Sequence, residues 1–173
     1  MAGNVKVLVG TKKGAFVYSC DEKRRSWEVS DPILPGWSFY HMSGDLRDSQ
    51  PRFYAAANHW AWGRSVAKST DLNEWDYRSE NLAFPPDMKS PSNHPIGEWN
   101  EAAPGAIGNI WSVTPGHESQ PGVVFATTQP AGLFRSEDWG QSWTPVESLN
   151  RHPNRKYWSG TGGGDSCMHS VEI

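Results

Sequence analysis

The segment from Ser136 to Trp143, with the sequence Ser-Glu-Asp-Trp-Gly-Gln-Ser-Trp, constrains the fold more than any other part of the chain. Ser136 and Asp138 carry side-chain oxygens that accept hydrogen bonds from nearby backbone N–H groups. Gly140 can adopt a positive φ angle, and Trp143 can pack the turn against a sheet. We therefore predict a tight turn between antiparallel strands, in which these four residues have a structural role.

The same order of strands and turn occurs three times, over residues 7–29, 52–77 and 122–146. Each copy contains a Ser-x-Asp sequence followed by a Trp, and the interval from Asp to Trp is six, four and five residues in chain order. Only the third copy keeps Gly before its Trp. The second has Asn73 there, a residue that tolerates the left-handed conformation of Gly. Repetition of this kind predicts an all-β repeat protein.

Each copy supplies the second, third and outermost strands of a four-stranded antiparallel propeller blade. Residues 37–43 and 109–114 have the composition of innermost strands for the second and third copies. The first copy has no such segment before it, whereas 167–173 resembles an innermost strand with no copy after it. We predict one partial β-propeller domain over 1–173 with about three blades. The blades are formed by 5–30 with 167–173, by 37–80 and by 109–149.

Propellers close with about four to eight blades, so three blades leave strand edges open. The sequence allows two explanations. The chain is the front half of a longer propeller, which is the explanation we favour, or two copies form a homodimer by exchanging residues 167–173.

The octapeptide resembles the Asp-box, or BNR, repeat of sialidase-like β-propellers. The segments 9–16, Val-Gly-Thr-Lys-Lys-Gly-Ala-Phe, and 130–136, Pro-Ala-Gly-Leu-Phe-Arg-Ser, are similar to bacterial proteins described as sialidase-like or glycosyl-hydrolase-like. So are His152-Pro153 and the glycines 162–164 before Met168-His169-Ser170. The resemblance covers nearly the whole chain. It implies a propeller of the WD40/YVTN-like kind, of which this chain is the N-terminal half.

Composition excludes several function classes. The net charge is −3, and Lys and Arg form only short pairs, so we expect no nucleic-acid partner. No stretch approaches the roughly 18 apolar residues of a membrane span, and the N-terminus lacks the apolar run of a signal peptide, so we expect a cytoplasmic protein without a membrane partner. Cys20 and Cys167 provide neither a disulfide framework nor a zinc site, and we expect no metal and no cofactor.

Propeller topology places six loops on the face opposite the Asp-box turns, namely 10–14, 31–37, 58–63, 82–108, 128–132 and 149–166. Long loops often carry function, and aromatic residues lie among acids and cations in these. This composition is typical of a site for a carbohydrate or another polar small molecule, because indole faces stack on C–H groups. The candidates are His59, Trp60, Trp62 and Trp158. The alternative is that the tryptophans only pack the loops against the blades.

The innermost strands align His41, Ser112 and His169 at one position. Alternation along a strand would direct the three side chains toward the axial channel, where imidazoles can bind water, a metal or an anion. Two histidines without a carboxylate at fixed spacing do not make a metal motif. We therefore assign His41 and His169 as ligand-binding candidates, and leave open whether they form one shared site.

The resemblance to sialidases implies a set of catalytic residues. An active sialidase needs an arginine triad, a Tyr nucleophile assisted by Glu, and an Asp acid/base. These parts are not identifiable here, and Pro51-Arg52-Phe53-Tyr54 does not match the Phe/Tyr-Arg-Ile-Pro segment of that family. We predict a ligand- or partner-binding module of undefined activity. The alternative is a glycoside hydrolase with paired carboxylates, for which Glu98 and Asp165 are the candidates.

Overall fold

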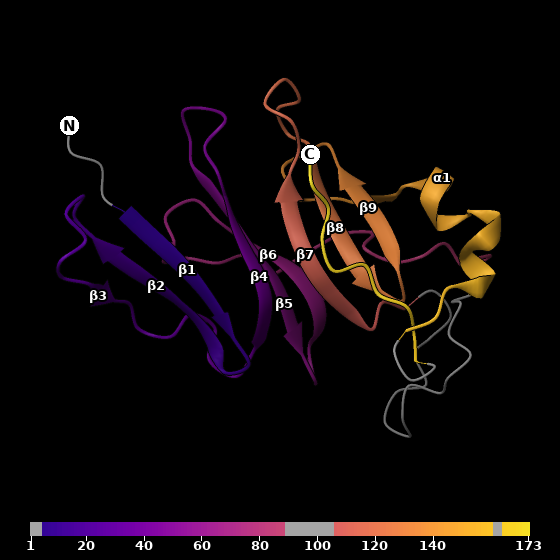
Figure 1. The fold of residues 1–173 in the computed structure, drawn as a ribbon, viewed down its shortest axis with the longest axis horizontal. Coiled ribbons are helices and arrows are strands. Elements are labelled where there is room, and N and C mark those ends of the chain that lie inside the picture. The colour runs from indigo at the N-terminus through magenta and orange to yellow at the C-terminus, as the bar shows by residue number, and fades with distance from the viewer. Residues whose placement is uncertain (1–4, 89–105, 161–163) are drawn as a thin grey trace.

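Three antiparallel sheets form most of the part of the chain that the structure describes (Figure 1). The structure is a computed structural model, and it describes residues 5–88, 106–160 and 164–173. The three sheets lie side by side in chain order, and we number them blade 1 to blade 3 from the N-terminus (Figure 1). The prediction of an all-β fold with about three propeller-type blades is confirmed.

Each blade is a simple meander in which neighbouring strands are consecutive in the chain. Blade 1 has the order β1-β2-β3, blade 2 the order β4-β5-β6, and blade 3 the order β7-β8-β9-β10. The strands are β1 (Val5–Thr11), β2 (Gly14–Cys20), β3 (Glu28–Val29), β4 (Ser38–Asp45), β5 (Arg52–His59), β6 (Gly63–Ser69), β7 (Asn109–Pro115), β8 (Val124–Gln129), β9 (Gly132–Ser136) and β10 (Thr144–Pro145). In blade 2 the place of the outermost strand is taken by an antiparallel bridge between Lys68 and Asp76.

The innermost strands of blades 2 and 3 lie where the sequence predicts them. β4 pairs antiparallel with β5, and β7 pairs antiparallel with β8. Both ladders shift register at the same point, around Tyr40 in β4 and around Trp111 in β7. A β-bulge bends a strand and re-aims its side chains, so both innermost strands change direction at equivalent positions.

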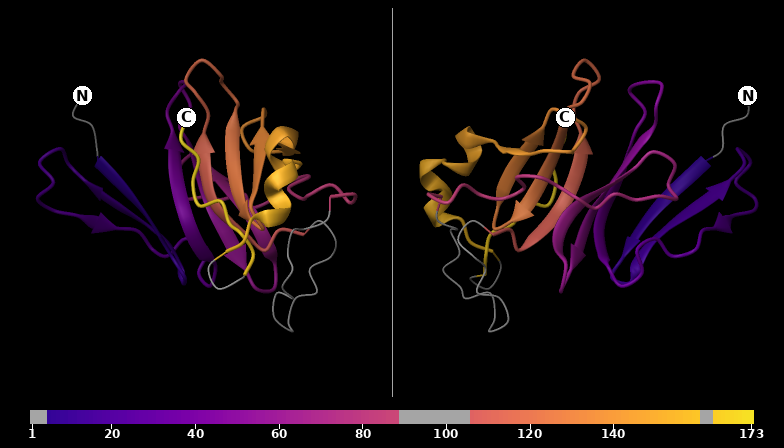
Figure 2. Two further views of the ribbon diagram at one scale, coloured as in Figure 1. Left: turned by 45° about the vertical axis from the view of Figure 1, so that its right-hand side comes forward. Right: turned by 180° about the vertical axis from the view of Figure 1, so that it is seen from behind.

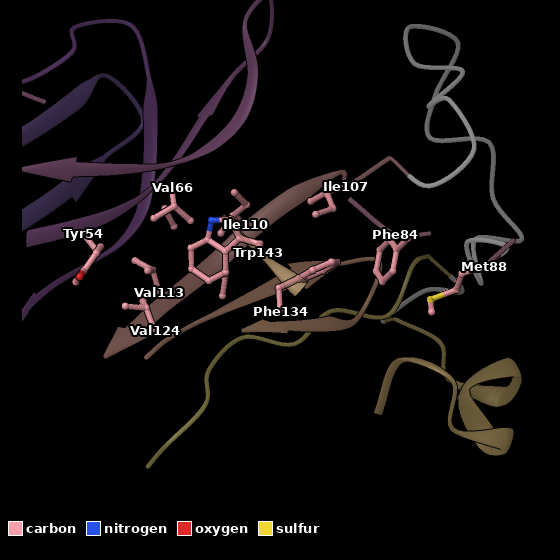
Figure 3. Close-up of a cluster of buried hydrophobic side chains, with 12 residues drawn as sticks. Tyr54, Val66, Phe84, Met88, Ile107, Ile110, Val113, Val124, Phe134 and Trp143 are labelled. Atoms are coloured by element: carbon pink, nitrogen blue, oxygen red, sulfur yellow. The ribbon is translucent and has the colours of Figure 1, made fainter. Parts of the chain in front are cut away.

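The core consists of two apolar layers, one on each side of blade 2. Side chains alternate between the faces of a strand, so β5 directs Ala55 and Ala57 toward blade 1 and Tyr54 and Ala56 toward blade 3. Ala55, Ala56 and Ala57 are fully buried, and their small side chains let both neighbours approach. The layer between blades 2 and 3 also contains Trp143, which fills the position predicted from the octapeptide (Figure 3).

Residues 167–173 differ from the expectation of an innermost strand. In the described structure they form no strand, and the segment crosses the front of β7 and β8 (Figure 1). The backbone N–H of Met168 donates to the carbonyl of Thr128 at 3.1 Å. Residues 167–173 are close to blade 3 within one chain, so they do not complete blade 1.

The segment after β10, which overlaps the expected loop 149–166, contains two short helices, α1 (Glu147–Asn150) and η1 (Pro153–Tyr157), at the outer side of blade 3 (Figure 2). The side chain of Asn150 is 2% exposed and pairs with Leu133 of β9, accepting from its N–H at 2.9 Å and donating to its carbonyl at 2.8 Å. It thus continues the sheet edge beyond β10. No helix in the described ranges has the length and apolar character needed to cross a bilayer.

Candidate functional site

The connections between strands gather on two opposite faces of the blades. The loop face carries residues 10–14, 31–37, 58–63 and 128–132, and the Asp-box face carries residues 46–51, 116–123 and 137–143. On the loop face, the backbone N–H of Gly36 donates to Lys13, and the rings of Trp37 and His59 lie 5.0 Å apart. The loops of blades 1 and 2 therefore meet there, as the topology predicts.

The β5–β6 hairpin on the loop face carries the most exposed aromatic side chains. Trp60 is 89% exposed and Trp62 is 77% exposed. The Nδ1 atom of His59 accepts hydrogen bonds from the backbone N–H groups of Ala61, at 3.0 Å, and Trp62, at 3.1 Å. His59 therefore fixes the hairpin backbone, and the two tryptophans face solvent instead of packing on the blade.

Trp158 belongs to a separate group on blade 3. Its ring stacks on His152 with centroids 6.3 Å apart, and His152 Nδ1 accepts from the N–H of Asn154 at 3.2 Å. Trp158 directly follows η1, and it is partly buried. No contact between this pair and the Trp60–Trp62 hairpin is observed among the described residues.

His41 joins the innermost strands of blades 2 and 3. Its Nδ1 accepts from the backbone N–H of Val113 at 3.3 Å, and Ser43 donates to the carbonyl of the same residue at 2.8 Å. Burial lowers the pKa of His41 below its usual value, which favours the neutral ring that can accept at Nδ1. This nitrogen of His41 is therefore used within the fold.

Among the described residues, no hydrogen bond or ring contact joins His41, Ser112 and His169 into one site. Ser112 is 1% exposed, and its hydroxyl lies 2.8 Å from that of Thr127 inside blade 3. His169 instead meets the ring of Trp111 edge-on at 4.9 Å, and its Nε2 lies 3.2 Å from Cys167 Sγ. Trp111, the residue left out of the β7–β8 register, packs its ring on Tyr40 with centroids 4.8 Å apart, and Tyr40 is left out of the β4–β5 register in the same way.

Of the two carboxylates expected for a glycosidase, that of Asp165 belongs to the described residues. Glu98 lies outside the described residues. Asp165 accepts a bond from the side chain of Gln129 through its backbone carbonyl, and its Oδ1 is buried without a hydrogen-bond partner in the described structure. Within the described ranges, no group of three or more His, Cys, Asp or Glu side chains could hold a metal ion.

The octapeptide turn is built as its residue types predict. Ser136 Oγ accepts from the N–H of Gly140 at 2.8 Å, and Asp138 Oδ1 accepts from the N–H groups of Gln141 and Ser142 at 3.0 and 2.9 Å. Burial raises the pKa of Asp138, but hydrogen bonds from Ser142 and Ser136 outweigh burial and hold the pKa below its usual value. The polar atoms are used within the turn, so they are not free for chemistry.

The second copy reaches a similar turn with different residues. Ser69 Oγ accepts from the N–H of Leu72 at 2.8 Å, and Asp71 Oδ1 accepts from the N–H of Asn73 at 2.8 Å. The positive φ angle lies at Leu72, at 70°, and not at Asn73 as expected. In the third copy both Trp139, at 62°, and Gly140, at 81°, have positive φ. The shorter turn of the second copy has one left-handed residue, which directly follows its Asp. The turn of the third copy has two, at the first and second positions after its Asp.

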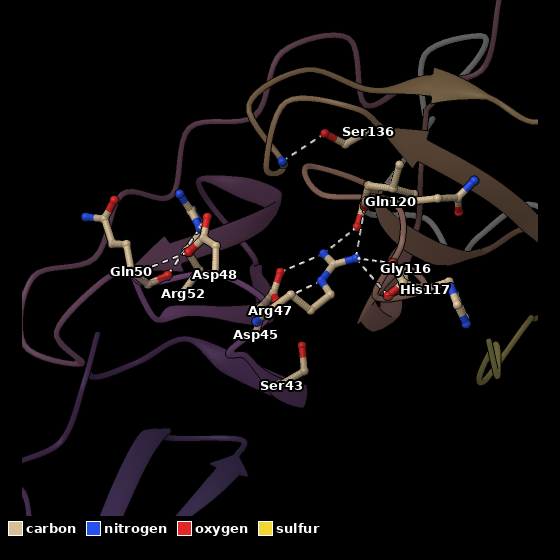
Figure 4. Close-up of polar contacts among 12 residues, drawn as sticks. Ser43, Asp45, Arg47, Asp48, Gln50, Arg52, Gly116, His117, Gln120 and Ser136 are labelled. Atoms are coloured by element: carbon tan, nitrogen blue, oxygen red, sulfur yellow. Dashed lines mark hydrogen bonds and ion pairs between the residues drawn. The ribbon is translucent and has the colours of Figure 1, made fainter.

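On the Asp-box face, Arg47 clamps blade 2 to blade 3 (Figure 4). Its Nε and Nη2 donate to the two carboxylate oxygens of Asp45 at 2.8 and 2.6 Å, and Asp45 is 2% exposed. The remaining donors reach backbone carbonyls at the β7–β8 connection, those of Gly116, His117, Gln120 and Val123. Burial raises the pKa of Asp45, but the bonds from Arg47 outweigh it and lower the pKa.

A cleft of about 570 Å³ opens on the Asp-box face between blade 2 and the octapeptide turn. Its lining includes Arg52, Tyr54 and Lys68 from blade 2 and Trp139 from blade 3. Sequence reasoning placed the site on the opposite face and missed this cleft. The available signal was the alternation Arg52-Phe53-Tyr54, which puts a cation and a phenol on one face of a strand.

Comparison with solved structures finds similarity to a chain described as YCF48 bound to D1 peptide, with a TM-score of 0.47 and 14% sequence identity. The alignment covers 82% of this chain and 36% of that chain, so this chain spans about a third of that protein's length. No protein-family model matches the chain, and no curated protein matches it. The assignment of propeller-type blades rests on the three sheets themselves.

Proposed function

We propose that this chain is a binding module of the sialidase-like Asp-box propeller class, and that the Trp60–Trp62 hairpin is its ligand-binding surface. The exposure of these two indoles supports the proposal most directly. Large aromatic side chains are usually buried, and exposed Trp is enriched at binding hot spots. Because His59 holds the hairpin backbone, the indoles are presented with little loss of conformational entropy on binding.

The ligand class that fits best is a carbohydrate. Indole faces stack on the C–H surfaces of sugar rings, and the hairpin offers two indoles within three residues. A protein partner that buries the same rings is the other class of occupant, and it would give no signal with free sugars.

We expect the chain to bind at least one oligosaccharide on an array of defined neutral and acidic glycans. The Trp60→Ala/Trp62→Ala variant should lose affinity for that glycan by at least about tenfold, because both stacking contacts are removed. The control is Trp27→Ala, since Trp27 is 42% exposed on blade 1 and away from the hairpin. Binding to no glycan, or equal binding by both variants, would contradict the proposal.

The glycoside hydrolase alternative makes a different prediction for the same glycan. A hydrolase would cleave it, and Asp165→Asn and Glu98→Gln would abolish cleavage while leaving binding intact. Binding without cleavage favours the binding module.

The edge of β1 that faces away from β2 has no strand partner in the described structure, which bears on how the chain assembles. Val17 directs its N–H and carbonyl to Ser30, on the β3 side, and Leu8 is the register partner of Val17. In an antiparallel pair, Leu8 and its alternate neighbours Lys6 and Gly10 therefore direct their backbone groups away from β2. β5 and β8 have an innermost strand at this edge, and β1 has none in the described structure. This open edge supports the explanation we favour, in which a longer propeller supplies the missing strand, and the alternative is that residues 167–173 of a second copy pair there.

Sedimentation of the 173-residue chain tests the exchange. The exchange predicts a dimer that dissociates in the Ser170→Pro variant, because Pro removes a backbone donor from the exchanged strand. The matched control Ser170→Ala keeps that donor and should remain dimeric. A monomeric wild-type chain would reject the exchange and favour the explanation that the chain is half of a longer propeller.

A further inference from the structure

The cleft on the Asp-box face is built around one row of side chains. Arg52 and Tyr54 alternate along β5, so they share the face of blade 2 that looks toward blade 3. Lys68 is the direct register partner of Tyr54 on β6 and lies on the same face. The octapeptide turn covers this row: a Cβ at Gly140 would lie 3.4 Å from Tyr54 Cε1 and 3.5 Å from Lys68 Cδ.

Each member of the row keeps a proton donor that nothing in the described structure uses. The hydroxyl of Tyr54 is buried without a hydrogen-bond partner in the described structure, and Tyr54 as a whole is 1% exposed. Arg52 donates through Nη1 alone, to Asp48 Oδ2 and the Gln50 carbonyl (Figure 4). Lys68 Nζ donates to the carbonyls of Arg78 and Gly140, which leaves its third N–H.

Buried polar groups in native proteins are almost always hydrogen-bonded, so an unpaired phenol in one row with two cationic side chains calls for an acceptor from outside the chain. An oxyanion supplies several acceptor positions and favourable charge for Arg52 and Lys68 at once. The donors therefore select for an anionic oxygen group over a neutral one.

The remaining lining restricts the ligand further. Trp75 and Trp139 add apolar surface, and the guanidinium of Arg52 lies 3.6 Å from the centroid of Trp139. Glu74 and Asp76 also line the cleft, and Asp76 is already paired with Arg78 at 3.0 Å. These two acids disfavour a doubly charged anion such as phosphate, because like charges in a cleft repel.

We propose that this cleft binds a small organic carboxylate with a planar apolar body. Its carboxylate accepts hydrogen bonds from the Tyr54 hydroxyl, Arg52 and Lys68, and its apolar body packs against the indole rings. This site is separate from the Trp60–Trp62 hairpin, which lies on the opposite face. The two binding proposals can therefore be tested, and rejected, independently.

Titration calorimetry of the 173-residue chain with benzoate tests the proposal. Benzoate should bind saturably, and benzamide, its neutral isostere, should bind at least about tenfold more weakly because it lacks the charge. Inorganic phosphate should not compete. Equal affinity for benzoate and benzamide, or no binding of benzoate, would overturn the proposal.

Two variants locate the site. Tyr54→Phe should weaken benzoate binding by about tenfold while leaving the melting temperature of the free protein unchanged or higher, because an unpaired buried hydroxyl contributes nothing to folding. Lys68→Met keeps the aliphatic stem and should also weaken binding, whereas Lys23→Met, at an exposed position on blade 1, should not. Full affinity in both Tyr54→Phe and Lys68→Met would place benzoate elsewhere and reject this site.

Discussion

The Arg47→Met variant is expected to lose about 3–5 kcal/mol of unfolding free energy, because it leaves a buried carboxylate without its partner. Asp45 is 2% exposed, and the side chain of Arg47 is 11% exposed. Water therefore has little access to the Asp45 carboxylate after Arg47 is replaced. The carbonyls of the β7–β8 connection lose their donor at the same time. Denaturant unfolding followed by circular dichroism measures the change.

Arg52→Met provides the matched control. Arg52 pairs with Asp48, whose side chain is 35% exposed, and such surface pairs contribute about 0–1 kcal/mol. Even with its contact to Trp139, Arg52 should contribute much less than Arg47. If the two variants were equally stable, Arg47 would not be the clamp between blades 2 and 3.

Asp138→Ala should reduce the unfolding free energy by about 2–3 kcal/mol, because several hydrogen bonds to one charged acceptor are lost together. The acceptor serves the N–H groups of Gln141 and Ser142 and the hydroxyls of Ser136 and Ser142. The folded protein lowers the pKa of Asp138, so this stabilisation is complete above the usual value of 3.8 and is lost as the pH falls through the folded value. Thermal unfolding from pH 7 to pH 2 should show a shallower acid loss in the variant.

Asp71→Ala is the control, because Asp71 is the equivalent residue in the second copy of the repeat. Asp71 makes similar bonds to Asn73 and Glu74, but its turn is more open to solvent, so its removal should have the smaller effect. A loss of stability in Asp71→Ala that exceeds the loss in Asp138→Ala would contradict the dominant role of the octapeptide.

The strand order was predictable from sequence because turn chemistry and alternation are local. Ser136, Asp138 and Gly140 hold their turn with bonds inside eight residues, and the copies at Ser69 and Ser19 repeat the same order of strands. The turn of the second copy was only partly predictable. Its left-handed residue is Leu72, because the shorter interval to Trp75 changes the turn geometry.

The sites were less predictable because they depend on contacts between blades. Sequence reasoning identified Trp60 and Trp62 as binding candidates, but it could not show that His59 Nδ1 is used by the hairpin. It also could not foresee that the Ser112 hydroxyl would be bonded to Thr127 inside blade 3. The Arg52–Tyr54–Lys68 row needs two strands and the turn of the next blade, so no single stretch of sequence contains it.

Hydrogen–deuterium exchange of the 173-residue chain and its Arg47→Met variant tests most directly whether blades 2 and 3 form one cooperative unit. In the wild-type chain, amides of β4, β5, β7 and β8 should exchange through one common opening, because His41, Ser43 and Arg47 bond across the joint. In the variant, protection should fall together in all four strands. Fast exchange confined to one blade, with the other blade unchanged, would contradict the joined-blade structure.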